Sequence, residues 1–291
     1  MKYAFLKQQR AEFKVAVMCR IFGVSRAGFY AWMARKPSAR TQETERLKLA
    51  IRIAHQKNRR VYGAVRLQPE LEKMGFIAGR DKIHRLKMAD NLICKQKKAY
   101  KITTHSEHTL PVSPNLLQQN FEASVPNQVW TVDISYIDTN EGWLYLAGIK
   151  DLFNKEMVGY AMGERMTVNL VGNALFRAVQ NKRPAAGLIH HSDRGSQYCS
   201  RRYQAMLKQF GMKSSMSGKG NCYDNAPIES FWGSLKNELV HHERYETRAQ
   251  AEASIREYIE IFYNRQRRHS SLGNLSPAEF TKRYYQKQRN L

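Results

Sequence analysis

The chain has 291 residues, 42% of them apolar, and carries 48 Lys and Arg against 25 Asp and Glu, a formal net charge of +23. This length favours two or three domains, while the absence of an apolar run of ~20 residues excludes a membrane span and the N-terminus lacks a signal peptide. The charge indicates a polyanionic partner, most often nucleic acid, and we expect a cytoplasmic protein.

The positive charge is unevenly distributed. Residues 1–123 hold 25 basic and 9 acidic residues (25 − 9 = +16), and residues 124–291 hold 23 and 16 (23 − 16 = +7).

The four cysteines form no C-x-x-C pair, which argues against a zinc ribbon and a disulfide scaffold. We therefore expect free thiols.

Residues 1–40 have the pattern of a helix-turn-helix segment. Apolar residues recur at helical spacing from Val15 to Phe22, Gly23 interrupts them, and Ser25 is placed to cap a second helix through Trp32. In such a unit the start of the second helix faces DNA bases, here Ser25, Arg26 and Gly28. An ordinary helical hairpin with a basic surface explains the pattern equally well.

Residues 41–94 predict a second helical DNA-binding unit. Helices are expected over about 43–57, from about 62 to Gly75, and over about 79–89. Pro69 should kink the middle helix or delay its start. The last helix carries the candidate DNA contacts Arg80, Lys82 and Arg85.

Residues 95–127 predict a basic, proline-containing linker. His105 and His108 have a spacing that metal ligands use, but no cysteine pair accompanies them. We therefore expect two solvated histidines and no zinc.

Residues 128–291 predict an α/β domain with a mixed sheet. Strands are expected over 129–137, 143–151 and 155–164, a helix over 167–182, and a fourth strand before Asp193. The pattern continues with a helix near 201–210 and a short strand over 212–217, and it ends with helices over about 225–240 and 248–264. Trp130 and Trp232 are interpreted as core residues.

Three carboxylates occupy positions that suit a metal site. Asp133 lies within the first strand, Asp193 ends the fourth, and Glu229 borders the apolar stripe of the 225–240 helix, with Lys236 two turns along the same edge. Two Mg²⁺ ions need several hard oxygen ligands. Spacing alone leaves open that these are surface or capping residues. Asp224 is interpreted as a cap or loop residue, and Asp151, at the end of a strand, as a structural residue.

Several segments resemble one known family in the right order. The sequences are GVSRAGFYAW (23–32), YGAVRL (62–67), VWTVDISYI (129–137), HSDRGSQY (191–198), NCYDNAPIESFWGSLKNE (221–238) and YNRQRRHSSLGNLSPAEF (263–280). They resemble the DDE transposases of the retroviral-integrase superfamily, specifically the OrfB-type transposases of bacterial insertion sequences. The resemblance spans nearly the whole chain.

The resemblance implies an RNase H-like catalytic core preceded by all-α DNA-binding modules. Asp133, Asp193 and Glu229 would be the catalytic triad that holds two Mg²⁺ ions, with Mn²⁺ as a substitute, and Lys236 the basic residue that contacts phosphate. The implied reaction is cleavage at the 3′ end of the element followed by strand transfer, in which the freed 3′ hydroxyl attacks another phosphodiester. Terminal inverted repeats and target DNA would be bound by at least a dimer at the nucleoid.

The resemblance also implies a small upstream partner with a helix-turn-helix and a leucine zipper. No heptads are sustained over three or four repeats here, so the partner is separate or the N-terminal helices recognise the ends themselves.

Two other functions remain open. One is an RNase H-type nuclease that only hydrolyses, and the other is an inactive DNA-binding regulator of element ends.

Further residues within these motifs are candidate DNA contacts because they follow the candidate carboxylate Asp193 or form a basic run. They are Arg194 and Gln197 after Asp193, and the basic run of Arg265, Arg267 and Arg268, for which a solvated helix face is the alternative. His190 and His191 precede Asp193, and their role is left open between assistance at the site and a structural hydrogen bond.

Overall fold

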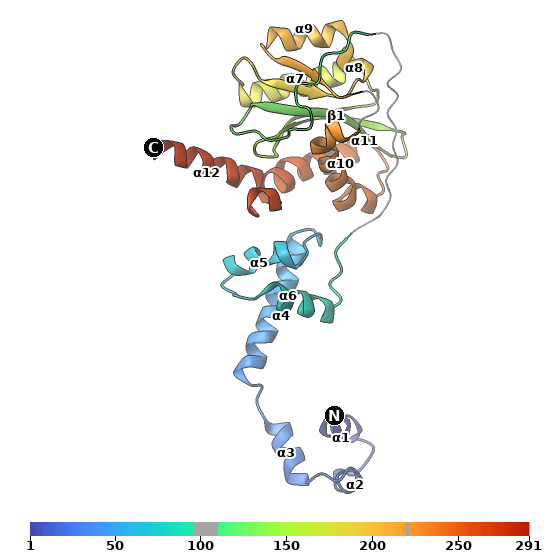
Figure 1. The fold of residues 1–291 in the computed structure, drawn as a ribbon. Helices are drawn as coiled ribbons and strands as arrows, with labels where there is room; N and C mark the ends of the chain where they lie inside the picture. Colours follow the sequence, from blue (N-terminus) through green and yellow to red (C-terminus); the bar gives the residue numbers. More distant parts are fainter. Residues whose placement is uncertain (96–109, 219–221, 291) are drawn as a thin grey trace. The chain divides into compact units, whose positions relative to one another are not determined.

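The computed structural model describes residues 1–95, 110–218 and 222–290, which divide into two compact units, Met1–Ile53 and Ala54–Leu291. His105 and His108 lie outside the described residues. Each unit is described separately below, with the element labels of Figure 1.

The first unit is a small helical cluster. Helices α1 (Lys2–Gln9), α2 (Val15–Ile21) and α3 (Arg26–Ala34) pack around four buried side chains, and α4 (Ala39–Lys57) follows and runs on into the second unit. Gly23 has φ +61°, which allows the turn after α2, and the Ser25 hydroxyl caps α3 by accepting a hydrogen bond from Gly28 N. The buried side chains are Leu6, Met18, Cys19 and Phe29.

This cluster confirms the predicted helix-glycine-helix order but adds α1. Only Leu6 of α1 is buried, so its sequence carries no clear apolar stripe. Helix α4 begins at Ala39, four residues earlier than expected.

The second unit opens with two helices after α4. Helix α5 (Ala64–Lys73) buries Leu67 and Leu71, and Gly75 follows it with φ +84°. Pro69 lies inside α5 without ending it, so the expected delay of this helix is wrong. Helix α6 (Arg80–Ala89) buries Ile83 and Leu86 on one face.

A five-stranded sheet forms the centre of the unit, in the order β3-β2-β1-β4-β5. Strands β1 (Val129–Ile137), β2 (Leu144–Asp151) and β3 (Met157–Gly163) are antiparallel, whereas β4 (Ile189–Ser192) and β5 (Lys213–Met216) run parallel to β1. The mixed sheet predicted from alternating strand and helix patterns is confirmed.

Helices cover both faces of the sheet (Figure 1). On one side α7 (Val168–Lys182), α8 (Ser196–Cys199) and α9 (Arg201–Gln209) enclose a core that includes Trp130 and Val132. Gly159 of β3 permits the close approach of α7, because a Cβ there would lie 2.6 Å from Ala174 O.

The other side is covered by the C-terminal helices. Helix α10 (Ala226–Glu238) packs its apolar stripe on the sheet, and α11 (Arg248–Glu257) continues into the π-helix η3 (Tyr258–Gln266) before α12 (Pro277–Arg289). Short 3-10 turns lie at Cys222–Asn225, Val240–His242 and Ser270–Leu272. Trp130 and Trp232 are 0% and 6% exposed, which confirms them as core residues.

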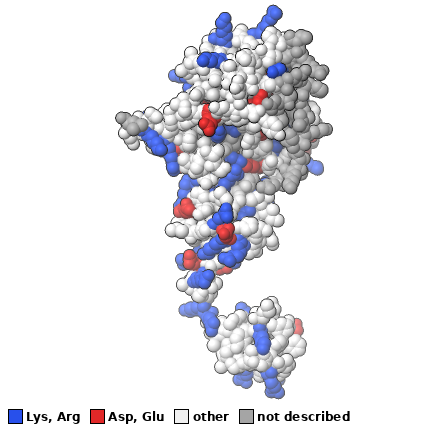
Figure 2. All heavy atoms as spheres, viewed as in Figure 1, with Lys and Arg blue, Asp and Glu red and all other residues white. Residues whose placement is uncertain are grey.

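Lys and Arg side chains are scattered over the face drawn in Figure 2, with fewer acidic side chains among them. Cys19, Cys94 and Cys199 are free thiols, as expected. Within the described residues, no helix combines the length and apolarity that a membrane crossing requires.

Candidate active site

Strand register brings two of the three candidate carboxylates together. Residues of β1 pair with residues of β4 that lie sixty positions later, from Val129 with Ile189 to Thr131 with His191. Continued by two residues, this register sets Asp193 opposite Asp133, and neighbouring strands lie ~4.8 Å apart. Asp133, in the middle of β1, therefore lies near Asp193, which follows the last residue of β4, and the two carboxylates are near enough to interact.

Trp232 of α10 contacts the Asp133 carboxylate on the face of the sheet that α10 covers. Its indole Nε1 donates a 2.9 Å hydrogen bond to Asp133 Oδ2. The ring fits because β2 presents Gly148 directly opposite Asp133, and a Cβ on Gly148 would lie 2.8 Å from the ring. The glycine thus provides the space that the indole needs.

We expect Gly148→Ala to lower DNA cleavage by about 10²-fold, because displacing Trp232 shifts Asp133, and displacements near 1 Å have effects of that size. Initial rates on a labelled duplex measure the loss. Gly233→Ala on α10 is the control, since its Cβ would meet no atom within 4 Å. Full activity of Gly148→Ala would show that this space is not needed.

The start of α10, which carries Glu229, is fixed by two buried side chains. Lys150 Nζ donates to Pro227 O at 2.7 Å, and Asn225 Nδ2 donates to Val132 O at 3.2 Å. Burial lowers the pKa of Lys150 to about 7, with Lys155 and Arg267 as further causes. These contacts tie the first turn of α10 to strands β1 and β2.

The electrostatics of the site suit a cation. Burial first, and then the neighbouring Asp193, raise the pKa of Asp133 to about 8, with Glu229 as a smaller cause in the same direction. Burial also raises the pKa of Glu229. Hard carboxylate oxygens that repel one another are the donors that Mg²⁺ prefers, so the residues fit a divalent ion.

The third carboxylate does not complete a closed cluster. Among the residues that the structure describes, no three His, Cys, Asp or Glu side chains form a group that would hold a metal ion. Asp133 and Asp193 are brought together, and Glu229 is near enough to influence Asp133 but stands further off. Gly195 N donates to Asp193 Oδ1 at 2.9 Å, which orients that carboxylate.

The histidines before Asp193 are buried in structural hydrogen bonds. His190 Nε2 lies 2.9 Å from Tyr203 Oη, and His191 bridges Ser215 Oγ at 2.8 Å and Asp224 O at 3.0 Å. Burial lowers the pKa of both, that of His190 to about 3. They therefore anchor β4 in neutral form.

The two other acidic candidates also have structural partners. Asp224 Oδ2 accepts hydrogen bonds from Asn115 Nδ2 and Gly218 N, and Asp151 accepts them from Asn127 N and Phe153 N. Their interpretation as loop and structural residues agrees with these contacts.

Four basic or polar candidates of the α/β domain are at least partly exposed. Lys236 Nζ lies 4.9 Å from the centroid of the Tyr136 ring. Burial lowers the pKa of Lys236, and the charge of Asp133 has a smaller effect in the opposite direction. Arg194 Nε donates to Ser217 O at 2.7 Å, and Gln197 Nε2 donates to Met166 O at 3.2 Å. Arg265 is exposed.

The predicted DNA contacts of Arg267 and Arg268 need correction. Each is 5% exposed. Arg267 forms a buried ion pair with Glu238, at 2.7 Å from Nη2 to Oε1, and Arg268 pairs with Glu70 of α5 at 2.6 Å. Their charges are already compensated inside the protein, so we do not retain them as phosphate contacts.

The helical candidates are accessible. Arg26 is exposed, and Ser25 is exposed with its hydroxyl engaged as the α3 cap. Arg80 and Arg85 of α6 are exposed, and Lys82 is half-buried. The Ser25 hydroxyl therefore has a structural partner before any DNA is bound.

Sequence reasoning missed Gly148, Lys150 and the hydrogen bond from Trp232. A lysine in an apolar strand is the signal that was available for Lys150, because a buried lysine needs a partner. No sequence signal pointed to Gly148.

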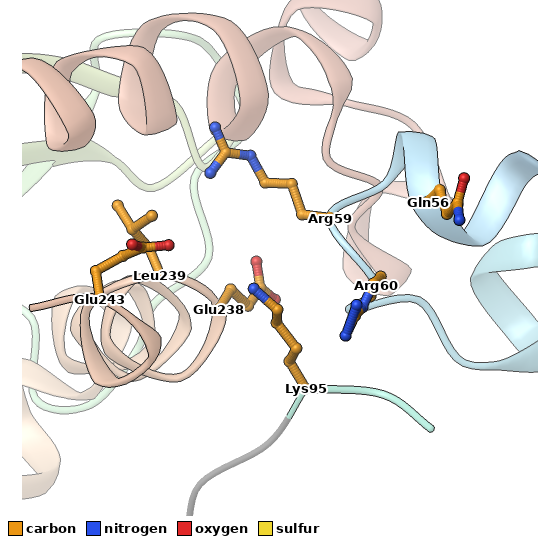
Figure 3. Close-up of a pocket in the computed structure, with 7 residues that line it drawn as sticks. All are labelled: Gln56, Arg59, Arg60, Lys95, Glu238, Leu239 and Glu243. Carbon is orange, nitrogen blue, oxygen red and sulfur yellow. The ribbon is translucent and has the colours of Figure 1, made fainter. Parts of the chain in front are cut away.

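A pocket of about 350 Å³ lies elsewhere in the second unit. It is lined by Gln56, Arg59, Arg60, Lys95, Glu238, Leu239 and Glu243. Figure 3 shows the side chains of Arg59, Lys95 and Glu238 around this space. None of the three candidate carboxylates lines it.

The comparisons with known proteins identify the class and then the family. Residues 123–222 and 229–284 match models of the integrase core domain, and residues 42–100 match an HTH-like domain. Together with the mixed sheet, these matches define an integrase-core polynucleotidyl transferase with an RNase H-like fold and a helical N-terminal region. Enzymes with this core are metal-dependent.

Two relatives cover nearly the whole chain. A 31 kDa protein of insertion element IS600 from Shigella sonnei is 60% identical over 92% of this chain and 99% of its own length. Transposase InsF of insertion sequence IS3A from Escherichia coli K12 is 42% identical over 96% of this chain and 98% of its own. The chain belongs to the OrfB-type DDE transposases of bacterial insertion sequences.

Among solved structures, a chain of the simian T-cell lymphotropic virus intasome in complex with the PP2A regulatory subunit B56 gamma is 13% identical, with a TM-score of 0.45. The match covers 74% of this chain and 70% of that one.

Proposed function

We propose that Asp133, Asp193 and Glu229 form the catalytic triad of this transposase and hold two Mg²⁺ ions, with Mn²⁺ able to substitute. The observation that carries this proposal is the β1–β4 register, which runs from Val129 with Ile189 to Thr131 with His191 and supports a position for Asp193, just beyond β4, near Asp133 of β1. When bound, the ions would activate the nucleophile and neutralise the leaving 3′ oxygen.

The protein's own residues supply positioning. Asp133 is oriented by Trp232, Asp193 by Gly195 N, and the first turn of α10 by Lys150. Glu229, in the first turn of α10, is the third carboxylate of the proposed site. Holding the scissile phosphate in line with its nucleophile is the main contribution of such a site.

Basic and polar side chains of the catalytic domain bind the DNA backbone. Lys236 contacts the scissile strand, and the proposed phosphate contacts beyond it are Arg194, Gln197 and Arg265. Upstream, we propose that α3 and α6 read the element's terminal inverted repeats through Ser25, Arg26, Arg80, Lys82 and Arg85. Phosphate contacts position the protein, and base contacts specify the sequence.

The assembly on DNA contains at least two copies, because two element ends must be joined. A small helix-turn-helix and leucine-zipper protein is a proposed further partner, and the reaction takes place on target DNA of the bacterial nucleoid in the cytoplasm.

A strand-transfer assay tests this function. The purified chain is incubated with Mg²⁺, labelled duplexes of its own element's ends, and a target plasmid. We expect 3′-end cleavage followed by covalent joining of the label to the plasmid. Cleavage without joining would indicate a nuclease that only hydrolyses, and binding without cleavage would indicate an inactive regulator.

A further inference from the structure

Trp143 is a large aromatic residue that the fold leaves exposed just beyond the end of the β1–β2 pairing. It immediately precedes β2, and 48% of it is accessible to solvent. Burying an indole stabilises a protein by an amount that grows with the apolar area removed from water. Folding alone therefore does not explain why this ring stays outside.

The backbone that carries Trp143 is firmly held. Gly142 has φ +100°, and its N donates to Thr139 O at 2.9 Å. Arg248 donates from Nε to Trp143 O at 3.2 Å and from Nη2 to Glu141 O at 2.7 Å. The exposed ring is thus presented by a rigid connection rather than by a loose loop.

The neighbours of Trp143 link it to the reaction centre. The Trp143 ring meets the Tyr136 ring edge to face, with centroids 5.0 Å apart and an interplanar angle of 84°. On the same tyrosine, Lys236 Nζ lies 4.9 Å from the ring centroid. Lys236 in turn is close enough to Asp133 for the two charges to interact.

We propose that Trp143, supported by Tyr136, is a stacking site for an unpaired DNA base beside the scissile phosphate. An aromatic surface next to a cation is the combination that binds single-stranded nucleic acid, because every base has a π-face and every phosphate a charge. The proposal rests on the proposed function, since it places the base relative to Lys236 and Asp133. A base freed from its pair at the cleaved end or at the target step fits this site.

Photocrosslinking tests the contact directly. Duplexes with 5-iodouracil at single positions near the cleavage point are bound to the full-length Asp193→Asn chain, irradiated, and analysed by peptide mass spectrometry. We expect a crosslink at Trp143. One arm carries the label in the element end and the other in the target duplex, so the arm that reacts identifies the source of the base.

Variants test the consequence for the reaction. We expect Trp143→Ala to lower cleavage and joining at least about tenfold and Trp143→Phe to restore most of the activity. The matched control is Phe176→Ala, which removes an aromatic residue of similar exposure, 52%, from α7. Thermal melting of all three chains checks that they fold.

The outcomes separate the two proposals. If the wild-type chain cuts and joins DNA but no base crosslinks to residue 143 and Trp143→Ala stays fully active, the stacking site is refuted while the proposed function stands. If the wild-type chain does not cut DNA, the proposed function fails, and the crosslink still decides whether a base lies on Trp143. A crosslink that forms only at residues other than Trp143 would place the unpaired base elsewhere and overturn the proposal.

Discussion

Asp193→Asn should reduce both cleavage and strand transfer by on the order of 10³-fold or more, because coordination supplies several kcal/mol of charge stabilisation in the transition state. Asparagine keeps the shape of the side chain and the acceptor for Gly195 N, which now lies 2.9 Å from Asp193 Oδ1. It removes the charge that a divalent ion needs. Initial rates on labelled element ends measure the effect.

The same substitution should leave the fold intact. It removes one of two adjacent carboxylates, whose repulsion contributes to the raised pKa of Asp133. Thermal unfolding is therefore expected at the wild-type temperature or above it. Asp138→Asn, an exposed carboxylate just beyond β1, is the matched control and should retain full activity. Cleavage by Asp193→Asn at the wild-type rate would mean that the triad is assigned wrongly.

Arg267→Met should destabilise the second unit by about 3–5 kcal/mol, the usual cost of leaving one partner of a buried ion pair uncompensated. The guanidinium donates to Glu238 from Nε at 2.8 Å and from Nη2 at 2.7 Å. Without it, Glu238 keeps the Tyr258 hydroxyl at 2.8 Å and Arg66 at 3.7 Å. Urea denaturation followed by tryptophan fluorescence measures the loss.

Two further chains show whether charge is the cause. Arg265→Met removes an exposed arginine two residues away and should change stability by no more than about 0.5 kcal/mol. The double replacement Arg267→Met with Glu238→Met should recover part of the loss, because the ion pair is then removed as a whole and only the partly exposed Arg66 loses its carboxylate. Equal stability of Arg267→Met and wild type would refute the buried pair.

The sequence predicted most of the elements because their patterns are local. Alternation marked β1, and the apolar stripe marked α10 together with the flank on which Glu229 and Lys236 lie. Helix α1 was missed because a single buried leucine gives no recognisable stripe. Local pattern therefore identified the elements that carry the candidate site.

The arrangement of side chains depended on distant partners that the sequence does not reveal. Arg267 and Arg268 looked like a solvated basic run, yet their carboxylates lie 29 residues upstream at Glu238 and 198 residues upstream at Glu70. Likewise, the motifs indicated Asp133 and Asp193, but their proximity depends on the pairing of β1 with β4, sixty residues later. The space that Gly148 leaves for Trp232 exists only because β1, β2 and α10 come together in the fold.

The sixty-residue offset between β1 and β4 also has a consequence for folding. Contacts between segments so far apart in sequence form late, because the chain must close a long loop before any pairing energy is gained. A nascent or partly folded chain thus holds its two aspartates apart. The proposed site is therefore assembled only when β1 and β4 have paired.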